Sequence, residues 1–216
     1  IRISKLYEFD GLDKIDVKEA TIGSIVAVSG ISDISIGDTL CSPENPQAIP
    51  FQKISEPTIA MQFIVNDSPF AGKEGKFVTS RHLRDRLYKE AVKDLSLRVT
   101  DGDTAEKFKV CGRGEMHLSI LIENMRRDGY EFQVSQPKVL LKMIDGVKCE
   151  PIDLLYLDVP EDCVGTVMNK MGTRKGDLQN MTPHGSRMRM EFLIPSRGLF
   201  GFKSEFLTDT RGEGIM

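Results

Sequence analysis

The clearest alternation of apolar and polar positions runs from Cys111 to Val139. Gly112 and Gly114 favour a tight turn, because glycine tolerates positive φ and close backbone approach. Apolar residues then recur at the i, i+3, i+4 and i+7 spacing of a helix with one buried side, and these are Leu118, Leu121, Ile122 and Met125. Gly129 suits the left-handed position after a last helical turn, and residues 132–134 alternate as in a strand. The stretch predicts turn, helix, turn and strand.

The preceding residues, from Thr58 onward, add a strand, a helix and a pair of strands. Apolar residues alternate in 59–65, a loop containing glycine and proline covers 68–76, and a helix is predicted from an N-cap at Thr79 or Ser80 to about Asp94. Two short strands are predicted on either side of the turn at 101–103. Residues 58–139 therefore have the order βαββαβ, which is typical of a ferredoxin-like domain.

The same order begins again after a connector at 140–149. A strand is predicted at 152–159, a helix at 164–171, a hairpin from 176–181 and 187–194, and a second helix at 198–207. Only the closing strand is missing, at most begun by Ile215 and Met216. Residues 150–216 therefore predict a second ferredoxin-like domain without its last strand, and we expect the C-terminus to be cut or disordered there.

The first fifty residues show no helical period. Short strand-like runs separated by turns favour part of a small β-barrel, and the chain begins inside such a run, so we expect its first residue not to be the natural start. Four prolines between Pro43 and Pro57 mark a linker, placed at 51–57. The predicted fold class is α+β, a partial β-barrel followed by two ferredoxin-like domains.

Composition and charge narrow the classes of function. The 216 residues carry a net charge of −3, so nothing draws the whole chain to a polyanion. Acidic residues prevail in 1–60 and basic residues in 163–216, so a polyanion would meet the C-terminal half. The four cysteines are scattered without metal-ligand spacing, which indicates reduced thiols in a cytosolic protein. No apolar run is long enough to span a membrane.

Three long stretches carry a family resemblance. The end of domain III of elongation-factor-G-like translational GTPases resembles GRGEMHLSILIENMRRDGYEFQVSQPKV, the start of their domain V resembles EPIDLLYLDVPEDCVGTVMNKMGTRKGDLQNM, and the end of their domain II barrel resembles residues 20–40. No room for domain IV remains between Val139 and Glu150. With IPSRGLFGFKSEFLT and SPFAGKEGKFVTSR, the chain is most similar to the TypA/BipA GTPases. It reads as a fragment: the end of domain II, domain III and most of domain V.

The resemblance implies a parent protein that hydrolyses GTP with Mg²⁺ in an N-terminal domain absent from this sequence, and a family-specific domain after Met216. Residues 72–77 only superficially resemble a phosphate-binding loop, because Phe77 replaces the required hydroxyl. We therefore expect no catalytic, cofactor-binding or metal-binding residue in this fragment, which should be inactive alone.

The resemblance also implies docking on the ribosome, through domain V on large-subunit RNA and proteins and domain III near the small-subunit shoulder. The candidate contacts are Arg174, Lys175, Arg187, Arg189 and Arg197 in the second repeat, and Arg113, Arg126 and Arg127 in the first. Cations at turns reach phosphates without entering a groove. We expect parent roles in translation, ribosome assembly or stress response, a cytoplasmic monomer, and no membrane or DNA partner.

Each candidate also has a structural interpretation. Arg126 and Arg127 can complement a helix dipole, Arg174 and Lys175 can form a solvated turn, and Arg187 and Arg189 can occupy the solvent face of a sheet. His117 is expected to pack or hydrogen-bond rather than to act in catalysis. The alternative function is a tandem ferredoxin-like regulatory module that binds a small molecule or mediates oligomerisation, which a pocket with convergent polar groups would favour.

Overall fold

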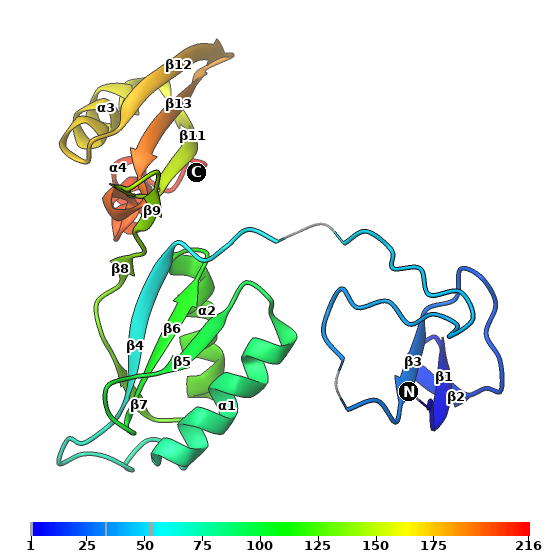
Figure 1. Cartoon of the computed structure of the whole chain (residues 1–216). Coiled ribbons are helices and arrows are strands. Elements are labelled where there is room, and N and C mark those ends of the chain that lie inside the picture. Colours follow the sequence, from blue (N-terminus) through cyan, green and yellow to red (C-terminus); the bar gives the residue numbers. More distant parts are fainter. Residues whose placement is uncertain (1, 33, 52–53) are drawn as a thin grey trace. The chain divides into compact units, whose positions relative to one another are not determined.

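The computed structural model describes residues 2–32, 34–51 and 54–216 and divides into two units, residues 1–53 and residues 54–216 (Figure 1). The linker predicted at 51–57 includes residues 52 and 53, which lie outside the described residues. Helices alternate with strands along the chain, and the strand pairs within each sheet are antiparallel, so the predicted α+β class is confirmed.

The first unit holds a three-stranded antiparallel sheet in the order β2-β1-β3. Its strands are β1 Lys5–Asp10, β2 Asp13–Asp16 and β3 Val26–Ser29. Residues 35–40 form a turn and loop without a strand. No closed barrel forms in the described part of this unit, because three strands of four to six residues cannot supply the continuous ladder that closure needs.

The second unit begins with a sheet of five strands and two helices. The strands are β4 Ile59–Val65, β5 Arg98–Asp101, β6 Lys107–Gly112, β7 Phe132–Val134 and β8 Lys138–Val139, and the helices are α1 Ser80–Lys93 and α2 Glu115–Arg127. The sheet order is β5-β6-β4-β7, antiparallel throughout, with β8 paired to β4. Alternate sheet residues, among them Phe63, Phe108 and Val110, form one core with the apolar sides of both helices. The sheet therefore turns one face to the helices.

Local signals explain where both helices begin and end. The hydroxyl oxygen of Thr79 accepts a hydrogen bond from the His82 amide at 3.4 Å, which confirms the predicted N-cap of α1. Gly129 has φ +87°, as the predicted C-terminal turn of α2 requires. Gly112 serves close packing rather than a positive φ, because a Cβ there would lie 2.8 Å from Cδ2 of Leu118.

The predicted connector at 140–149 is a β-hairpin. Strands β9 Lys142–Ile144 and β10 Val147–Cys149 pair across a two-residue turn, in which Asp145 has φ +49° and Gly146 has φ +79°. Asp-Gly is favoured where both central residues need positive φ. The connector thus has its own secondary structure.

The remaining residues form a second sheet with helices. They are β11 Ile152–Pro160, a 3-10 turn, α3 Val164–Thr173, β12 Asp177–His184, β13 Arg187–Pro195, a second 3-10 turn at Ser196–Leu199, and α4 Phe202–Asp209. The sheet order is β11-β13-β12, and the predicted hairpin is confirmed. Ile215 forms an isolated antiparallel bridge with Asp158, through two backbone hydrogen bonds of 2.9 Å. The closing strand, which the sequence at most begins at Ile215 and Met216, is therefore a single bridge.

The helix predicted at 198–207 is wrong in one respect, because it is broken. Phe200 is extended and Gly201 has φ +70°, so the 3-10 turn and α4 are separate. Phe200 packs against the core of residues 59–139 instead of the core beneath α4. In an unbroken helix, Phe200 would have to follow the helix and could not extend to that core. Its packing therefore accounts for the break.

Candidate nucleic-acid interface

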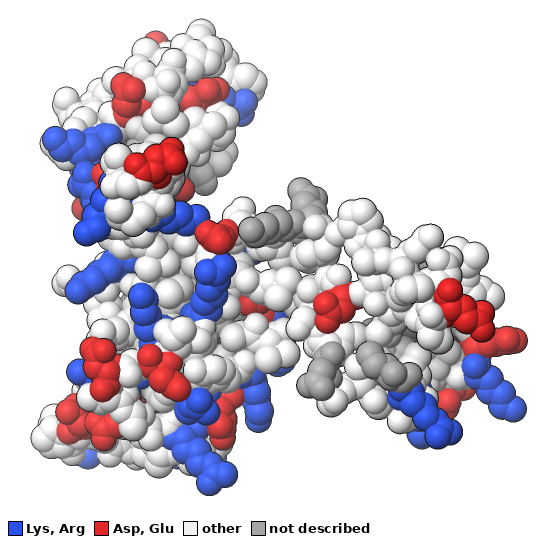
Figure 2. All heavy atoms as spheres, viewed as in Figure 1, with Lys and Arg blue, Asp and Glu red and all other residues white. Residues whose placement is uncertain are grey.

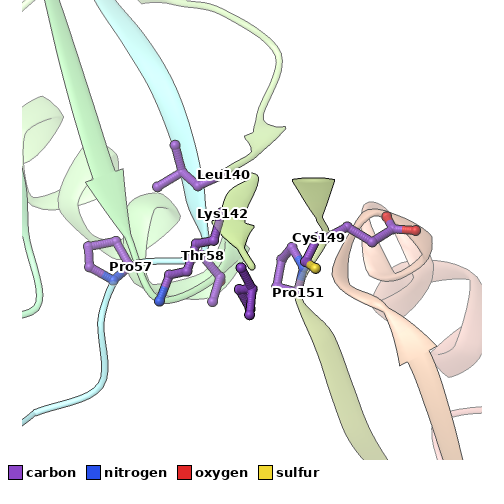
Figure 3. A pocket seen from close by; sticks show the side chains of 8 residues that line it. Pro57, Thr58, Leu140, Lys142, Cys149 and Pro151 are labelled. Atoms are coloured by element: carbon purple, nitrogen blue, oxygen red, sulfur yellow. The ribbon is translucent and has the colours of Figure 1, made fainter. Parts of the chain in front are cut away.

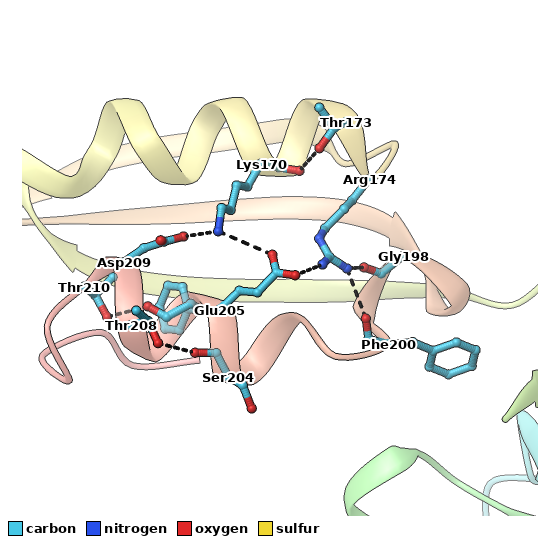
Figure 4. A network of polar contacts seen from close by, with 11 residues as sticks. Lys170, Thr173, Arg174, Gly198, Phe200, Ser204, Glu205, Thr208, Asp209 and Thr210 are labelled. Atoms are coloured by element: carbon cyan, nitrogen blue, oxygen red, sulfur yellow. Dashed lines mark hydrogen bonds and ion pairs between the residues drawn. The ribbon is translucent and has the colours of Figure 1, made fainter. Parts of the chain in front are cut away.

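Arg174 follows α3 and is held inside the fold (Figure 4). Its guanidinium donates to the carbonyl oxygens of Gly198 at 2.7 Å and Phe200 at 3.1 Å, and it lies 3.0 Å from a carboxylate oxygen of Glu205. It also stands over the ring of Phe202, 5.2 Å from the centroid. The side chain is 20% exposed, so most of its hydrogen-bonding capacity serves the broken-helix segment.

Lys175 is arranged differently from its neighbour. It occupies the left-handed region at φ +66° and is exposed. No ion pair joins it to a carboxylate in the described residues, whereas nearby Lys170 lies 2.7 Å from Asp209 and 3.4 Å from Glu205. Lys175 is thus the cation at this turn that remains available to a partner.

Arg187 and Arg189 share one face of β13, as predicted. Side chains alternate along a strand, and the neighbouring Met190 is buried on the opposite face, between the sheet and the helices. Arg187 forms an ion pair with Asp158 and donates to the backbone oxygens of Asp158 at 2.9 Å and Glu213 at 2.8 Å. The Arg189 side chain is 55% exposed, and its guanidinium lies as far as 4.0 Å from the Asp158 carboxylate. Arg187 therefore holds the C-terminal segment, and Arg189 faces solvent.

The other paired candidates lie at exposed positions. Arg197 forms a two-pronged contact with Glu150, at 2.8 and 3.3 Å. Arg126 and Arg127 both donate to Glu123, and these hydrogen bonds lower the pKa of Glu123 to about 2. Exposed pairs of this kind add little stability and exchange readily for other anions.

Arg113 lies in the turn before α2, with its side chain exposed. Its backbone is fixed, because its carbonyl oxygen accepts from the Thr58 hydroxyl at 2.8 Å and its amide donates to Nδ1 of His117 at 3.3 Å. Nε2 of His117 lies 2.8 Å from Asp94, so the predicted hydrogen-bonding role of His117 is confirmed. Burial raises the pKa of Asp94, but hydrogen bonds from Ser96 and the contact with His117 outweigh it and lower that pKa.

Four cations that the sequence analysis did not select share one face of the five-stranded sheet, the face opposite its helices. They are Arg98, Lys107, Lys109 and Lys138. The alternation of Lys107 and Lys109 with the buried Phe108 and Val110 was the available signal. Figure 2 shows Lys and Arg side chains, with Asp and Glu side chains among them, over the part of the chain that holds the five-stranded sheet. We call these four residues the lysine face.

The glycine-rich loop at 66–76 surrounds a carboxylate of its own chain. Glu131 accepts hydrogen bonds from the backbone amides of Gly72, Glu74 and Gly75 at 2.9–3.1 Å, and from the Asn66 side chain. The amides of Gly75 and Gly72 contribute most to lowering the pKa of Glu131 to about 2. The loop is therefore ordered by Glu131, as a surface loop rather than a nucleotide site.

This geometry predicts a specific pH dependence. Because the folded pKa of Glu131 is near 2 and its ordinary value is 4.5, its stabilising effect is complete above about pH 4.5 and is lost as pH falls towards 2. We expect the amide resonances of Gly72 and Gly75 to shift with a midpoint near pH 2 in an NMR titration. In Glu131→Gln this transition should vanish and both amides should exchange faster at neutral pH. Unchanged exchange in the variant would contradict the role of the carboxylate.

The cavity lined partly by the connector gives little support to a small-molecule site. It has a volume of about 180 Å³ and is lined by residues that include Thr58, Leu140 and Pro151 (Figure 3). Its cation, Lys142, is paired with Glu56 at 2.5 Å, and ligand pockets commonly measure 300–1,000 Å³. Among the described residues no group of three His, Cys, Asp or Glu side chains could hold a metal ion, and no helix is long and apolar enough to cross a membrane.

Comparison with known proteins finds relatives along the whole chain. The model of the elongation factor G C-terminus matches residues 147–216. All 216 residues align with proteins named large ribosomal subunit assembly factor BipA, at 55% identity in Synechocystis sp., 50% in Bacillus subtilis and 51% in Escherichia coli. The chain spans 36%, 35% and 36% of the lengths of these relatives.

A solved structure shows the same fold at low identity. The crystal structure of ttk003000868 from Thermus thermophilus matches 100% of this chain and 48% of its own, with a TM-score of 0.55 and 15% identity. At that identity the likeness concerns the fold alone. Identity of 50–55% along the whole chain, together with the elongation factor G match, shows that the chain is homologous over its full length to about a third of each BipA protein.

Proposed function

We propose that this chain is the ribosome-docking portion of a BipA-type translational GTPase that acts in assembly of the large ribosomal subunit. The observation that carries the proposal is its 50–55% identity, over every residue, to proteins named large ribosomal subunit assembly factors. In this proposal GTP and Mg²⁺ bind in another domain of the whole protein, and the chain is a cytoplasmic monomer that positions that domain on ribosomal RNA and protein.

The finer architecture belongs to the same proposal. We assign residues 1–50 to the end of a domain II barrel, 58–139 to a domain III-like ferredoxin fold and 150–216 to a domain V-like ferredoxin fold. The strand order β5-β6-β4-β7 supports the second assignment, because it is the antiparallel strand order of a ferredoxin-like βαββαβ domain. The match at 147–216 supports the third.

Among the eight predicted contacts, the exposed and least engaged cations are the strongest candidates. Lys175 and Arg189 in the second half and Arg113 in the first can reach phosphates without breaking a well-formed internal contact. Arg126, Arg127 and Arg197 would exchange an exposed carboxylate for a phosphate. Arg174 and Arg187 would have to give up backbone carbonyl contacts, so we assign them positioning roles.

Co-sedimentation with purified bacterial ribosomal subunits over a salt series tests the proposal. We expect the chain to sediment with the large subunit at low salt, with affinity that falls as salt rises, because contacts between cations and phosphates release counterions. Replacing Lys175 and Arg189 by Gln should weaken binding about tenfold or more, whereas Lys89→Gln on α1 should not. A chain that remains in the supernatant with both subunits at low salt would refute docking by this portion.

A further inference from the structure

The five-stranded sheet formed by β4 to β8 has one face without a covering helix. Both helices pack on the face that carries Phe63, Phe108 and Val110, so the alternate residues of each strand point the other way. Strand register sets Gln62 opposite Lys109, and Ala60 opposite both Cys111 and Lys138. Arg98 stands opposite Cys111 on β5. The cations of these strands therefore lie on one continuous surface.

This surface also has a groove at its centre. The groove has a volume of about 350 Å³, and its lining includes Ala60, Gln62, Lys109, Ser135, Lys138 and Leu140. Lys109 and Lys138 belong to this lining and are both exposed. Two cations thus flank a shallow, partly polar depression.

The charge on the lysine face is largely uncompensated. No ion pair joins Lys107, Lys109 or Lys138 to a carboxylate within the described residues, and Arg98 lies 3.5 Å from Glu56 at the edge. Burial raises the pKa of the Cys111 thiol in the middle of the face, and the positive charges of Lys109 and Arg98 oppose that rise. Both cations therefore lie close to Cys111, and strand register places Arg98 directly opposite it.

We propose that the lysine face binds the sugar–phosphate backbone of base-paired RNA. This inference rests on the proposed function, since it names the surface and the chemistry through which residues 59–139 would meet the ribosome. None of the eight arginine and lysine positions predicted from the sequence belongs to this surface.

The composition of the face favours paired RNA over a single strand. The aromatic rings of Phe63, Phe108 and Phe132 lie on the helix side, where the rings of Phe63 and Phe132 stack at 5.3 Å. Unpaired bases are usually held by exposed aromatic rings, which the described part of this face lacks. Exposed Gln62 and Thr100 instead offer donors and acceptors suited to phosphates and 2′-hydroxyls.

The same composition argues against a protein partner. Stable protein interfaces place large apolar or aromatic anchors at their centre. The centre of this face holds Ala60 and Cys111, each only 8% exposed, between lysines. Lysine is depleted at protein interfaces, whereas proteins that bind a phosphate backbone use lysine and arginine to neutralise its charge.

The test compares two triple variants of the chain with the same change in charge. Lys107→Gln, Lys109→Gln and Lys138→Gln remove the face, and Lys18→Gln, Lys76→Gln and Lys89→Gln remove exposed lysines elsewhere. The probes are protein-free ribosomal RNA, a blunt RNA duplex and polyuridylate, with dissociation constants measured over a salt series. Thermal unfolding of both variants establishes that each is folded.

We expect the face variant to bind ribosomal RNA and the duplex at least about tenfold more weakly than the wild-type chain. The slope of log K against log salt should fall by about 2, because each lost phosphate contact contributes roughly 0.7–0.9. The control variant should stay within about twofold of wild type. Equal losses in the two variants, or tighter binding to polyuridylate than to the duplex, would overturn the inference.

Two further results separate this inference from the proposed function. If the face variant still sediments with ribosomal subunits as the wild type does, docking stands and the lysine face is not its route. If a photo-crosslinker at Gln62 captures ribosomal protein instead of RNA, the assignment of RNA is wrong. Crosslinks to RNA that disappear in the face variant support it. Failure of the wild-type chain to sediment with either subunit refutes the proposed function itself.

Discussion

Replacement of Arg174 by Ala is expected to lower the free energy of unfolding of residues 152–216 by about 2–4 kcal/mol. The guanidinium donates to two backbone carbonyls, of Gly198 and Phe200, and pairs with Glu205. Its removal leaves the carbonyls without that donor, and breaks the tie between the end of α3 and the segment that leads into α4. Chemical denaturation followed by circular dichroism measures the loss.

Two variants distinguish this structural role from a general effect of charge. Lys175→Gln removes one positive charge from the adjacent exposed position and should change stability by less than about 0.5 kcal/mol. Arg174→Lys keeps the charge but cannot span both carbonyl oxygens and the carboxylate, so it should recover only part of the loss. Equal stability of Arg174→Ala and Lys175→Gln would contradict the contacts described.

Phe206→Ala should cost more, about 3–5 kcal/mol, because it opens a cavity in the core beneath α4. Phe206 is 1% exposed, and its ring centroid lies 5.6 Å from that of Phe202. The backbone after α4 rests on the same ring, since a Cβ on Gly214 would lie 2.5 Å from it. We therefore expect the amide of Ile215, which pairs with Asp158, to exchange faster in the variant.

The neighbouring position supplies the control for this second variant. Leu207 belongs to the same helix and is 40% exposed, so Leu207→Ala removes an apolar side chain without opening a buried cavity. Its cost should stay below about 1 kcal/mol, and exchange at Ile215 should be unchanged. A comparable loss in both variants would contradict a specific role for packing on Phe206, because alanine itself favours the helix at both positions.

Elements fixed by local pattern were predictable, and elements fixed by distant contacts were not. The apolar spacing of α2 and the N-cap of α1 are local, and both agree with prediction. The break at Gly201 is not local, because Leu199, Phe202 and Phe206 retain a helical spacing while Phe200 is drawn to the other core. The hairpin at 142–149 had a local signal in Asp145-Gly146, which the interpretation as a connector overlooked.

The candidate site divides in the same way. That Arg187 and Arg189 share a face follows from strand alternation, whereas the partner of Arg187 comes from another strand and from the backbone of Glu213. Sequence shows that a cation is present, but only tertiary structure shows whether it is already engaged. The lysine face depends on the pairing of β8 with β4, which brings Lys138 to the strands that carry Lys107 and Lys109.

The break at Gly201 also has a thermodynamic consequence. Phe200 lies in the part of the chain that forms the sheet β11-β13-β12, but its side chain covers the core of the five-stranded sheet and excludes water from it. Glu115 at the start of α2 in turn accepts a hydrogen bond from the Gly201 amide at 3.2 Å. Part of the free energy that keeps each half folded is therefore shared, and the melting of one half removes apolar cover from the other. Residues 54–216 should consequently unfold with a cooperativity that neither half would show by itself.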